Sequence, residues 1–90
     1  MIRKTIWKFP LPAVSPVVIA MPKGAEVLTV QTQDGMPHVW AFVDPDAERE
    51  DRYFDIYGTG QFIHPGVDTK RTYIGTYQEP PFVWHLFERR

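Results

Sequence analysis

The stretch at residues 25–44 reads AEVLTVQTQDGMPHVWAFVD. Two runs of alternating apolar and polar residues flank the dipeptide Asp34-Gly35, a pattern typical of a two-residue type I′ turn between antiparallel strands. Such a turn sets the pairing register, so Gln31 is expected opposite His38. The stretch therefore predicts a β-hairpin whose strands cover residues 25–33 and 36–44.

The two faces of this hairpin differ in character, because side chains alternate along a strand. The predicted core face carries Leu28, Val30, Val39, Ala41 and Val43. The opposite face carries Thr29, Gln31, His38, Trp40 and Phe42. Pro37 has no N–H to give to a sheet, which predicts that the strand over 36–44 is an edge strand, or is frayed at that end.

The rest of the chain is divided by prolines and glycines into short runs rich in Val, Ile, Thr and aromatic residues. These runs predict further strands near residues 3–9, 15–21, 52–58, 71–78 and 82–88. One helical turn is expected after Asp44, with Pro45 at its first position, and a loop is expected over 60–70. The pattern predicts an all-β fold, a small antiparallel sandwich or barrel of about six to seven strands with at most one short helical turn.

Length and charge limit what the protein can be. Its 90 residues correspond to one small β domain over residues 1–90, and the absence of cysteine excludes disulfides. A net charge of −1 disfavours nucleic acid or an anionic membrane as partner of the molecule as a whole. Lys4, Lys8 and Pro10 interrupt any signal peptide, and no apolar run approaches the ~20 residues of a membrane span. We therefore expect a cytoplasmic protein without membrane contact.

The thirteen aromatic residues exceed what a core of this size consumes. Some are expected on a partner surface, in a ligand pocket or at a homo-oligomer interface. The ligand- or partner-binding surface is predicted to use His38, Trp40, Tyr57, Tyr73, Tyr77 and Trp84 for stacking and Thr59 and Arg71 for polar contacts.

No catalytic residue, cofactor or metal site is predicted. The only serine, Ser15, lies in no nucleophile motif, and the histidines at 38, 64 and 85 lack short metal-ligand spacing. His38 is expected to contact a ligand, and His85 to be packed or at an interface. The acidic run over 44–51 lacks the glycine and glutamate of a calcium loop, so a solvated loop is expected.

Several short motifs allow more than one interpretation. Gly58-Thr59-Gly60 predicts a strand end or bulge, with an anion contact through Thr59 and nearby N–H groups as the alternative. Residues 56–59 and 73–76 share a Gly-Thr pair, which is too little to define a repeat. Basic pairs begin at Arg3, Lys70 and Arg89, and two of them would meet at one edge if the first and last strands pair; otherwise they blunt edges and aid solubility.

Longer segments carry a resemblance. They read TIWKFPLP at 5–12, MPKGAEVLTVQTQDGMPHVWAFVDP at 21–45, IYGTG at 56–60, YIGTYQ at 73–78 and FVWHLFE at 82–88. In order and spacing they resemble a family of short uncharacterised proteins of tailed bacteriophages and prophages, over nearly the whole chain. The resemblance implies a phage source and the host cytoplasm as location. It assigns no activity and no residue role.

These observations together favour a non-enzymatic phage accessory protein that acts by binding, as a homo-oligomer. It would sequester a nucleotide-type signal or block a host defence protein. A minor virion or assembly component is the alternative, and a nucleic-acid-binding module is the third hypothesis.

Overall fold

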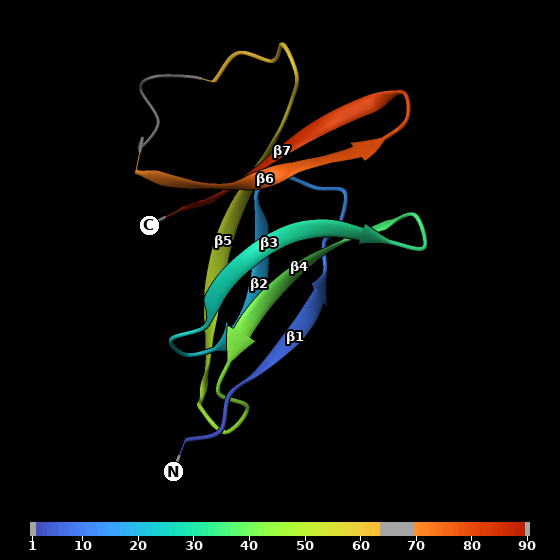
Figure 1. Ribbon diagram of the computed structural model, residues 1–90. Coiled ribbons are helices and arrows are strands. Elements are labelled where there is room, and N and C mark those ends of the chain that lie inside the picture. The colour runs from blue at the N-terminus through green and yellow to red at the C-terminus, as the bar shows by residue number, and fades with distance from the viewer. Residues whose placement is uncertain (1, 64–69, 90) are drawn as a thin grey trace.

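Seven antiparallel strands form two facing sheets in the computed structural model, which describes residues 2–63 and 70–89 (Figure 1). The three-stranded sheet has the order β1 (Thr5–Pro10), β4 (Met36–Val43), β3 (Glu26–Gln33). The four-stranded sheet has the order β2 (Val17–Pro22), β5 (Arg49–Gly58), β7 (Phe82–Arg89), β6 (Arg71–Glu79). The all-β, sandwich-like arrangement confirms the predicted fold class. The described residues include no helix long and apolar enough to cross a membrane.

The hairpin of β3 and β4 forms around the predicted turn. Asp34 and Gly35 have φ angles of 52° and 77°, the left-handed values that a type I′ turn requires at both central positions. Gln31 lies opposite His38, as expected. The turn chemistry therefore predicts the register correctly next to the turn.

Further from the turn, a β-bulge between Val27 and Thr29 shifts the register. Val27, and not Leu28, lies opposite Ala41. Because one extra residue in a strand moves the following side chains to the other face, Leu28 points outward with 44% of its surface exposed. The prediction of Leu28 as a core residue is wrong for this reason.

β4 lies in the centre of the three-stranded sheet, so it is not an edge strand over its whole length, but at the Pro37 end it pairs on the β3 side alone, which agrees with the predicted alternative for that end. The strand β1 pairs with it on the side away from β3, and the last pair is Pro10 opposite His38. Pro37 follows immediately beyond this pair, and its carbonyl accepts a hydrogen bond from the Leu11 N–H at 3.1 Å. A proline fits here because β1 has already ended, so no neighbouring strand needs a backbone N–H from residue 37.

The segment after β4 is a turn rather than a helical turn. The Asp44 carboxylate accepts a hydrogen bond from the N–H of Asp46 at 3.0 Å. The backbone carbonyl of Asp44 accepts one from the N–H of Ala47 at 3.1 Å. β5 already begins at Arg49, because residues 49–51 pair with residues 20–22 of β2. Part of the acidic run expected in a solvated loop is therefore strand.

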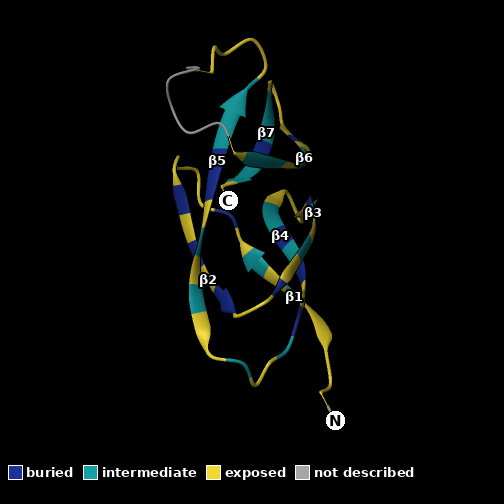
Figure 2. Cartoon of the chain, turned by 90° about the vertical axis from the view of Figure 1, so that its left-hand side faces the viewer, coloured by how far each residue is buried: buried dark blue, intermediate teal, exposed yellow. Residues whose placement is uncertain are grey.

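The core lies between the sheets, where buried residues of both layers meet (Figure 2). The Cα atoms span only 16 Å along the shortest axis, which leaves room for two layers and not for a third. Each sheet therefore has one face toward the core and one toward solvent. The buried apolar residues are Leu11, Val17, Ile19, Met21, Ala25, Val30, Val39, Ala41, Val43, Phe54, Tyr77 and Leu86.

Contact between the two sheets is closest where β6 crosses β3. A second β-bulge, between Tyr73 and Gly75, bends β6 at this place. A Cβ atom on Gly75 would lie 3.0 Å from Cγ1 of Val30. Val30 is a buried residue with an exposed fraction of 2%. Glycine is thus the residue that lets the two strands approach.

We expect Gly75→Ala to lower the free energy of unfolding by about 1–3 kcal/mol, because the added methyl group overpacks against the buried Val30 side chain. Adding Val30→Ala removes the clashing methyl groups, so the double variant should lose less than the sum of the two single variants. Urea unfolding measures all three. Val18→Ala, at an exposed position on β2, is the control and should change stability by less than about 0.5 kcal/mol. A Gly75→Ala protein as stable as the parent would contradict the close approach.

Candidate functional site

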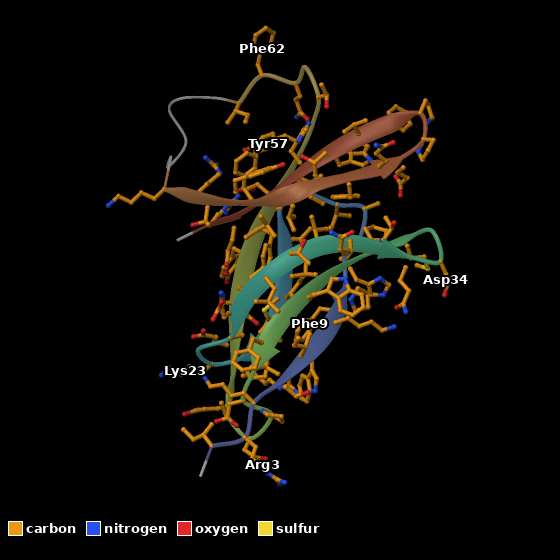
Figure 3. All side chains as sticks on the ribbon, in the orientation of Figure 1. Arg3, Phe9, Lys23, Asp34, Tyr57 and Phe62 are labelled. Atoms are coloured by element: carbon orange, nitrogen blue, oxygen red, sulfur yellow. The ribbon has the colours of Figure 1, made fainter. Side chains whose placement is uncertain are left out.

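A hollow of about 350 Å³ opens on the solvent face of the four-stranded sheet, where β7 lies between β5 and β6. We call it the outer hollow. Figure 3 labels Tyr57, near the place where β5 crosses the β6–β7 hairpin. The walls of the hollow include three aromatic rings, Tyr57, Tyr73 and Phe87, and three polar side chains, Thr59, Thr76 and His85. Ile63 and the turn after β5 complete the lining.

The aromatic rings form one connected group. The Phe87 ring centroid lies 5.9 Å from that of Tyr57 and 5.3 Å from that of Tyr73, with interplanar angles of 71° and 56°. Phe87 is at the centre because it is on β7, opposite Tyr73 in the register. Tilted ring pairs of this kind are favourable and hold each other in place. Tyr73 keeps 54% of its surface exposed, so part of its ring remains open to a ligand.

His85 links the polar groups of the hollow into a chain. Its Nε2 lies 2.7 Å from Oγ1 of Thr59, and its Nδ1 lies 2.9 Å from Oγ1 of Thr76. The Thr76 hydroxyl is in turn hydrogen-bonded to the Tyr73 hydroxyl. A neutral imidazole offers one donor and one acceptor, so these groups form a directional hydrogen-bond chain.

The β-bulge in β6 makes this chain possible. Tyr73 and Thr76 are three positions apart, and strict alternation would put them on opposite faces. The bulge between Tyr73 and Gly75 brings both to the solvent face, opposite Phe87 and His85.

The turn at Gly58–Gln61 closes one end of the hollow, and the predicted strand end at Gly58 is confirmed. The N–H of Gly58 donates to the Gln61 side chain at 3.0 Å, and the N–H of Gln61 donates to the Gly58 carbonyl at 3.0 Å. The N–H of Thr59 donates to the carbonyl of Val83 on β7 at 3.1 Å. Three of the four backbone N–H groups in this turn are thus already used, which weakens the alternative of an anion-binding loop.

Beside the hollow, two arginines bind one buried carboxylate. Nε of Arg71 lies 2.9 Å from Asp55 Oδ2, and Nε and Nη2 of Arg89 each lie 2.8 Å from a carboxylate oxygen of Asp55. The hydrogen bond from Arg89, with that from Arg71, lowers the pKa of Asp55 below its ordinary 3.8 although burial acts in the opposite direction. The Arg71 guanidinium also lies 5.9 Å from the Tyr57 ring centroid, so the cluster supports one wall of the hollow.

This arrangement corrects the expectation for the basic pairs. The first and last strands do not pair, since β1 and β7 belong to different sheets. Arg71 and Arg89 meet because β6 pairs with β7 in a register that sets them opposite each other.

The eight residues predicted to bind a ligand fall into three places. Tyr57, Thr59 and Tyr73 line the outer hollow and Arg71 borders it. His38 and Trp40 lie on the solvent face of the other sheet. Tyr77 and Trp84 face the core and line a second cavity, which we call the inter-sheet cleft.

The inter-sheet cleft has a volume of about 350 Å³ and a mostly apolar lining, which includes Leu11, Ile56 and Trp84. Burial, together with the nearby charge of Glu79, raises the pKa of Tyr77 to about 12. The Tyr77 hydroxyl therefore stays uncharged at neutral pH. Strict alternation would put Tyr77 on the same face of β6 as Tyr73. The bulge at Ile74 breaks the alternation, so Tyr77 faces the core instead.

Five side chains of the hollow were not predicted as site residues: Gln61, Ile63, Thr76, His85 and Phe87. One signal was present, because the two shared Gly-Thr pairs, Gly58-Thr59 and Gly75-Thr76, lie on the strands that flank His85. The described residues include no group of three His, Cys, Asp or Glu side chains that could hold a metal ion. His64 lies outside the described residues.

We expect Asp55→Asn to lower the free energy of unfolding by about 2–4 kcal/mol at pH 7, because Arg71 keeps only 8% of its side chain exposed and would lose its partner. The pKa of Asp55 is lower in the folded than in the unfolded protein. The contribution of the Asp55 carboxylate to the free energy of unfolding is therefore complete above about pH 4 and is lost as the pH falls through the folded-state pKa. The gap between parent and variant should therefore narrow as the pH is lowered. Urea midpoints at several pH values measure it.

Asp51→Asn is the matched control, since Asp51 is an exposed carboxylate on the same face of β5. It should leave stability within about 0.5 kcal/mol at every pH. A gap for Asp55→Asn that stays constant down to pH 2 would contradict the assigned ion pairs.

A model of the DUF7352 family, described as a domain of unknown function, matches residues 2–90 of this chain. No curated protein and no solved structure matches it.

Proposed function

Because the chain belongs to a family of unknown function, DUF7352, we propose its function from its own residues: it is a non-enzymatic protein that binds a nucleotide-type ligand in the outer hollow. One observation carries the proposal. Open aromatic surface and a hydrogen-bonded chain of hydroxyl and imidazole groups line the same hollow.

The aromatic wall suits a planar ring. Tyr57 and Tyr73 are each tilted against Phe87, so a base inserted beside Tyr73 would contact more than one ring. Stacking of a base on an aromatic side chain contributes about 1–3 kcal/mol and tolerates any base. Thr59, Thr76 and the Tyr73 hydroxyl supply donors and acceptors for the base edge or for ribose hydroxyls.

The charge beside the hollow suits an anionic group. The Arg71 guanidinium, which is bonded to Asp55, lies 5.9 Å from the Tyr57 ring centroid and places a cationic group beside the hollow. We therefore orient the ligand with its ring near Tyr73 and its phosphate toward Arg71. The turn at Gly58–Gln61 is not part of the phosphate site, because most of its N–H groups are bonded within the protein.

The biological role that we propose follows from the sequence resemblance to tailed-phage proteins. In that setting the protein would act as an accessory factor in the host cytoplasm and sequester a nucleotide-type signal. Assembly as a homo-oligomer stays a prediction. Blocking of a host protein is the second candidate, and it is favoured by Phe62, a residue that is 92% exposed on the loop after β5 (Figure 3).

Calorimetry against nucleosides, mononucleotides, ADP-ribose and cyclic dinucleotides tests the proposal. We expect at least one member to bind, and we expect Tyr57→Ala to weaken that binding about tenfold because a stacking wall is lost. Thr59→Val keeps the side-chain shape but removes the hydroxyl, and it should weaken binding by about fivefold. Recovery of the ligand unchanged after incubation is expected of a protein that binds without turnover.

Tyr53→Ala is the matched control, because Tyr53 is an exposed tyrosine on the same face of β5 that does not line the hollow. Its affinity should stay within twofold of the parent. Absence of binding to every ligand, or equal losses in Tyr53→Ala and Tyr57→Ala, would refute the proposed site. Chemical conversion of the ligand would refute the non-enzymatic role.

A further inference from the structure

A row of rings lies on the solvent face of the three-stranded sheet, on the side of the molecule that the outer hollow does not reach. His38, Trp40 and Phe42 occupy alternate positions of the central strand β4 and therefore point to the same side. The ring centroids of His38 and Trp40 are 6.3 Å apart, and strand geometry separates successive members of the row by about 6.8 Å along β4. We call this the β4 ring row.

Lysines cover the β4 ring row from the side of β1. Nζ of Lys8 lies 6.0 Å from the Trp40 ring, directly opposite it in the register, and Nζ of Lys4 lies 5.6 Å from the Phe42 ring. Among the described residues, no ion pair holds either ammonium group. Glu26 lies opposite Phe42 on the β3 side and places one carboxylate near these two ammonium groups.

The β3 side of the row adds hydrogen-bonding groups. Thr29 and Gln31 lie opposite Trp40 and His38. Gln31 is exposed, and the Gln33 side chain accepts a hydrogen bond from Lys8. Amide side chains can donate and accept, which suits the edges of unpaired bases. Lys8 thus reaches across the row to an amide of β3, and Gln31 lies beside the rings on the β3 side.

We propose that this face binds a single strand of nucleic acid, with bases on Trp40 and Phe42 and phosphates along Lys4 and Lys8. The charge, ring and amide rows are the combination that single strands require: a cationic track for the backbone and aromatic platforms for the bases. On binding, each ammonium would leave its ring for a phosphate, and the ring face would become available to a base. The proposal is independent of the nucleotide site, which lies on the other sheet.

The expected binding is weak and sensitive to salt, because only two lysines contact phosphates. Two such contacts on a single strand give a slope of about −1.4 in log K against log salt. This modest slope agrees with the near-neutral net charge of the chain, which precludes a large electrostatic contribution.

Fluorescence anisotropy of a labelled oligothymidylate ten-mer, titrated between 20 and 200 mM KCl, tests the proposal. Phe42→Ala, at a position 38% exposed, should weaken binding about fivefold or more. Lys4→Gln and Lys8→Gln should each reduce the salt slope by about 0.7. Trp40→Ala should weaken binding as well, and its urea midpoint shows whether the half-buried ring is also needed for folding.

Tyr53→Ala, on the other sheet, is the control and should bind like the parent. A duplex of the same length should bind more weakly, because paired bases cannot stack on side chains. The proposal is overturned if the ten-mer does not bind at 20 mM KCl, if the lysine variants keep the parent slope, or if the duplex binds equally well. Binding of anionic vesicles instead of the oligonucleotide, or a dimer that Phe42→Ala dissociates, would assign the face to another partner and overturn it too.

Discussion

The approach of Gly75 to Val30 is the constraint on which the rest of this structure depends. It joins β6 and β3, two edge strands of different sheets, and it requires a residue without a Cβ atom at the crossing. Both strands carry a β-bulge just before the crossing, at Leu28 and at Ile74. Bulges increase local twist and bend a strand, and here they accompany the close contact of the two layers. The same bulges decide which side chains face solvent, so packing and surface chemistry have one origin.

Most of the fold could be predicted from local signals. All seven strands and the Asp34-Gly35 turn follow from alternation and turn chemistry, which act over a few residues. The errors have non-local causes. Leu28 was placed on the wrong face because the bulge in β3 breaks alternation without a distinctive residue to mark it. The central position of β4 depends on pairing with β1, more than 25 residues earlier in the chain, which no local pattern encodes.

The candidate site shows the same division. Tyr57, Thr59 and Tyr73 could be proposed from residue type and position, and the structure places them in one hollow. His85 and Thr76 were not proposed, because their role depends on β5 and β6, which flank β7, and the shared Gly-Thr pairs alone do not reveal that arrangement. A two-layer domain also explains the excess of aromatic residues. Each sheet has an outer face with no third layer to cover it, and both outer faces carry rings beside polar or cationic groups.

The hydroxyl chain through His85 has a consequence for selectivity. Among the described residues, the Thr59 hydroxyl at its outer end contacts, besides His85, the Val83 carbonyl at 3.5 Å, which is too long to dictate the direction of the hydrogens. If the imidazole hydrogen moves from one ring nitrogen to the other, every hydroxyl in the chain can turn and no heavy atom has to shift. The Tyr73 end can then offer a ligand either a hydrogen or a lone pair. A site of this kind discriminates by the outline of the ligand and is tolerant of the hydrogen-bonding pattern on its edge.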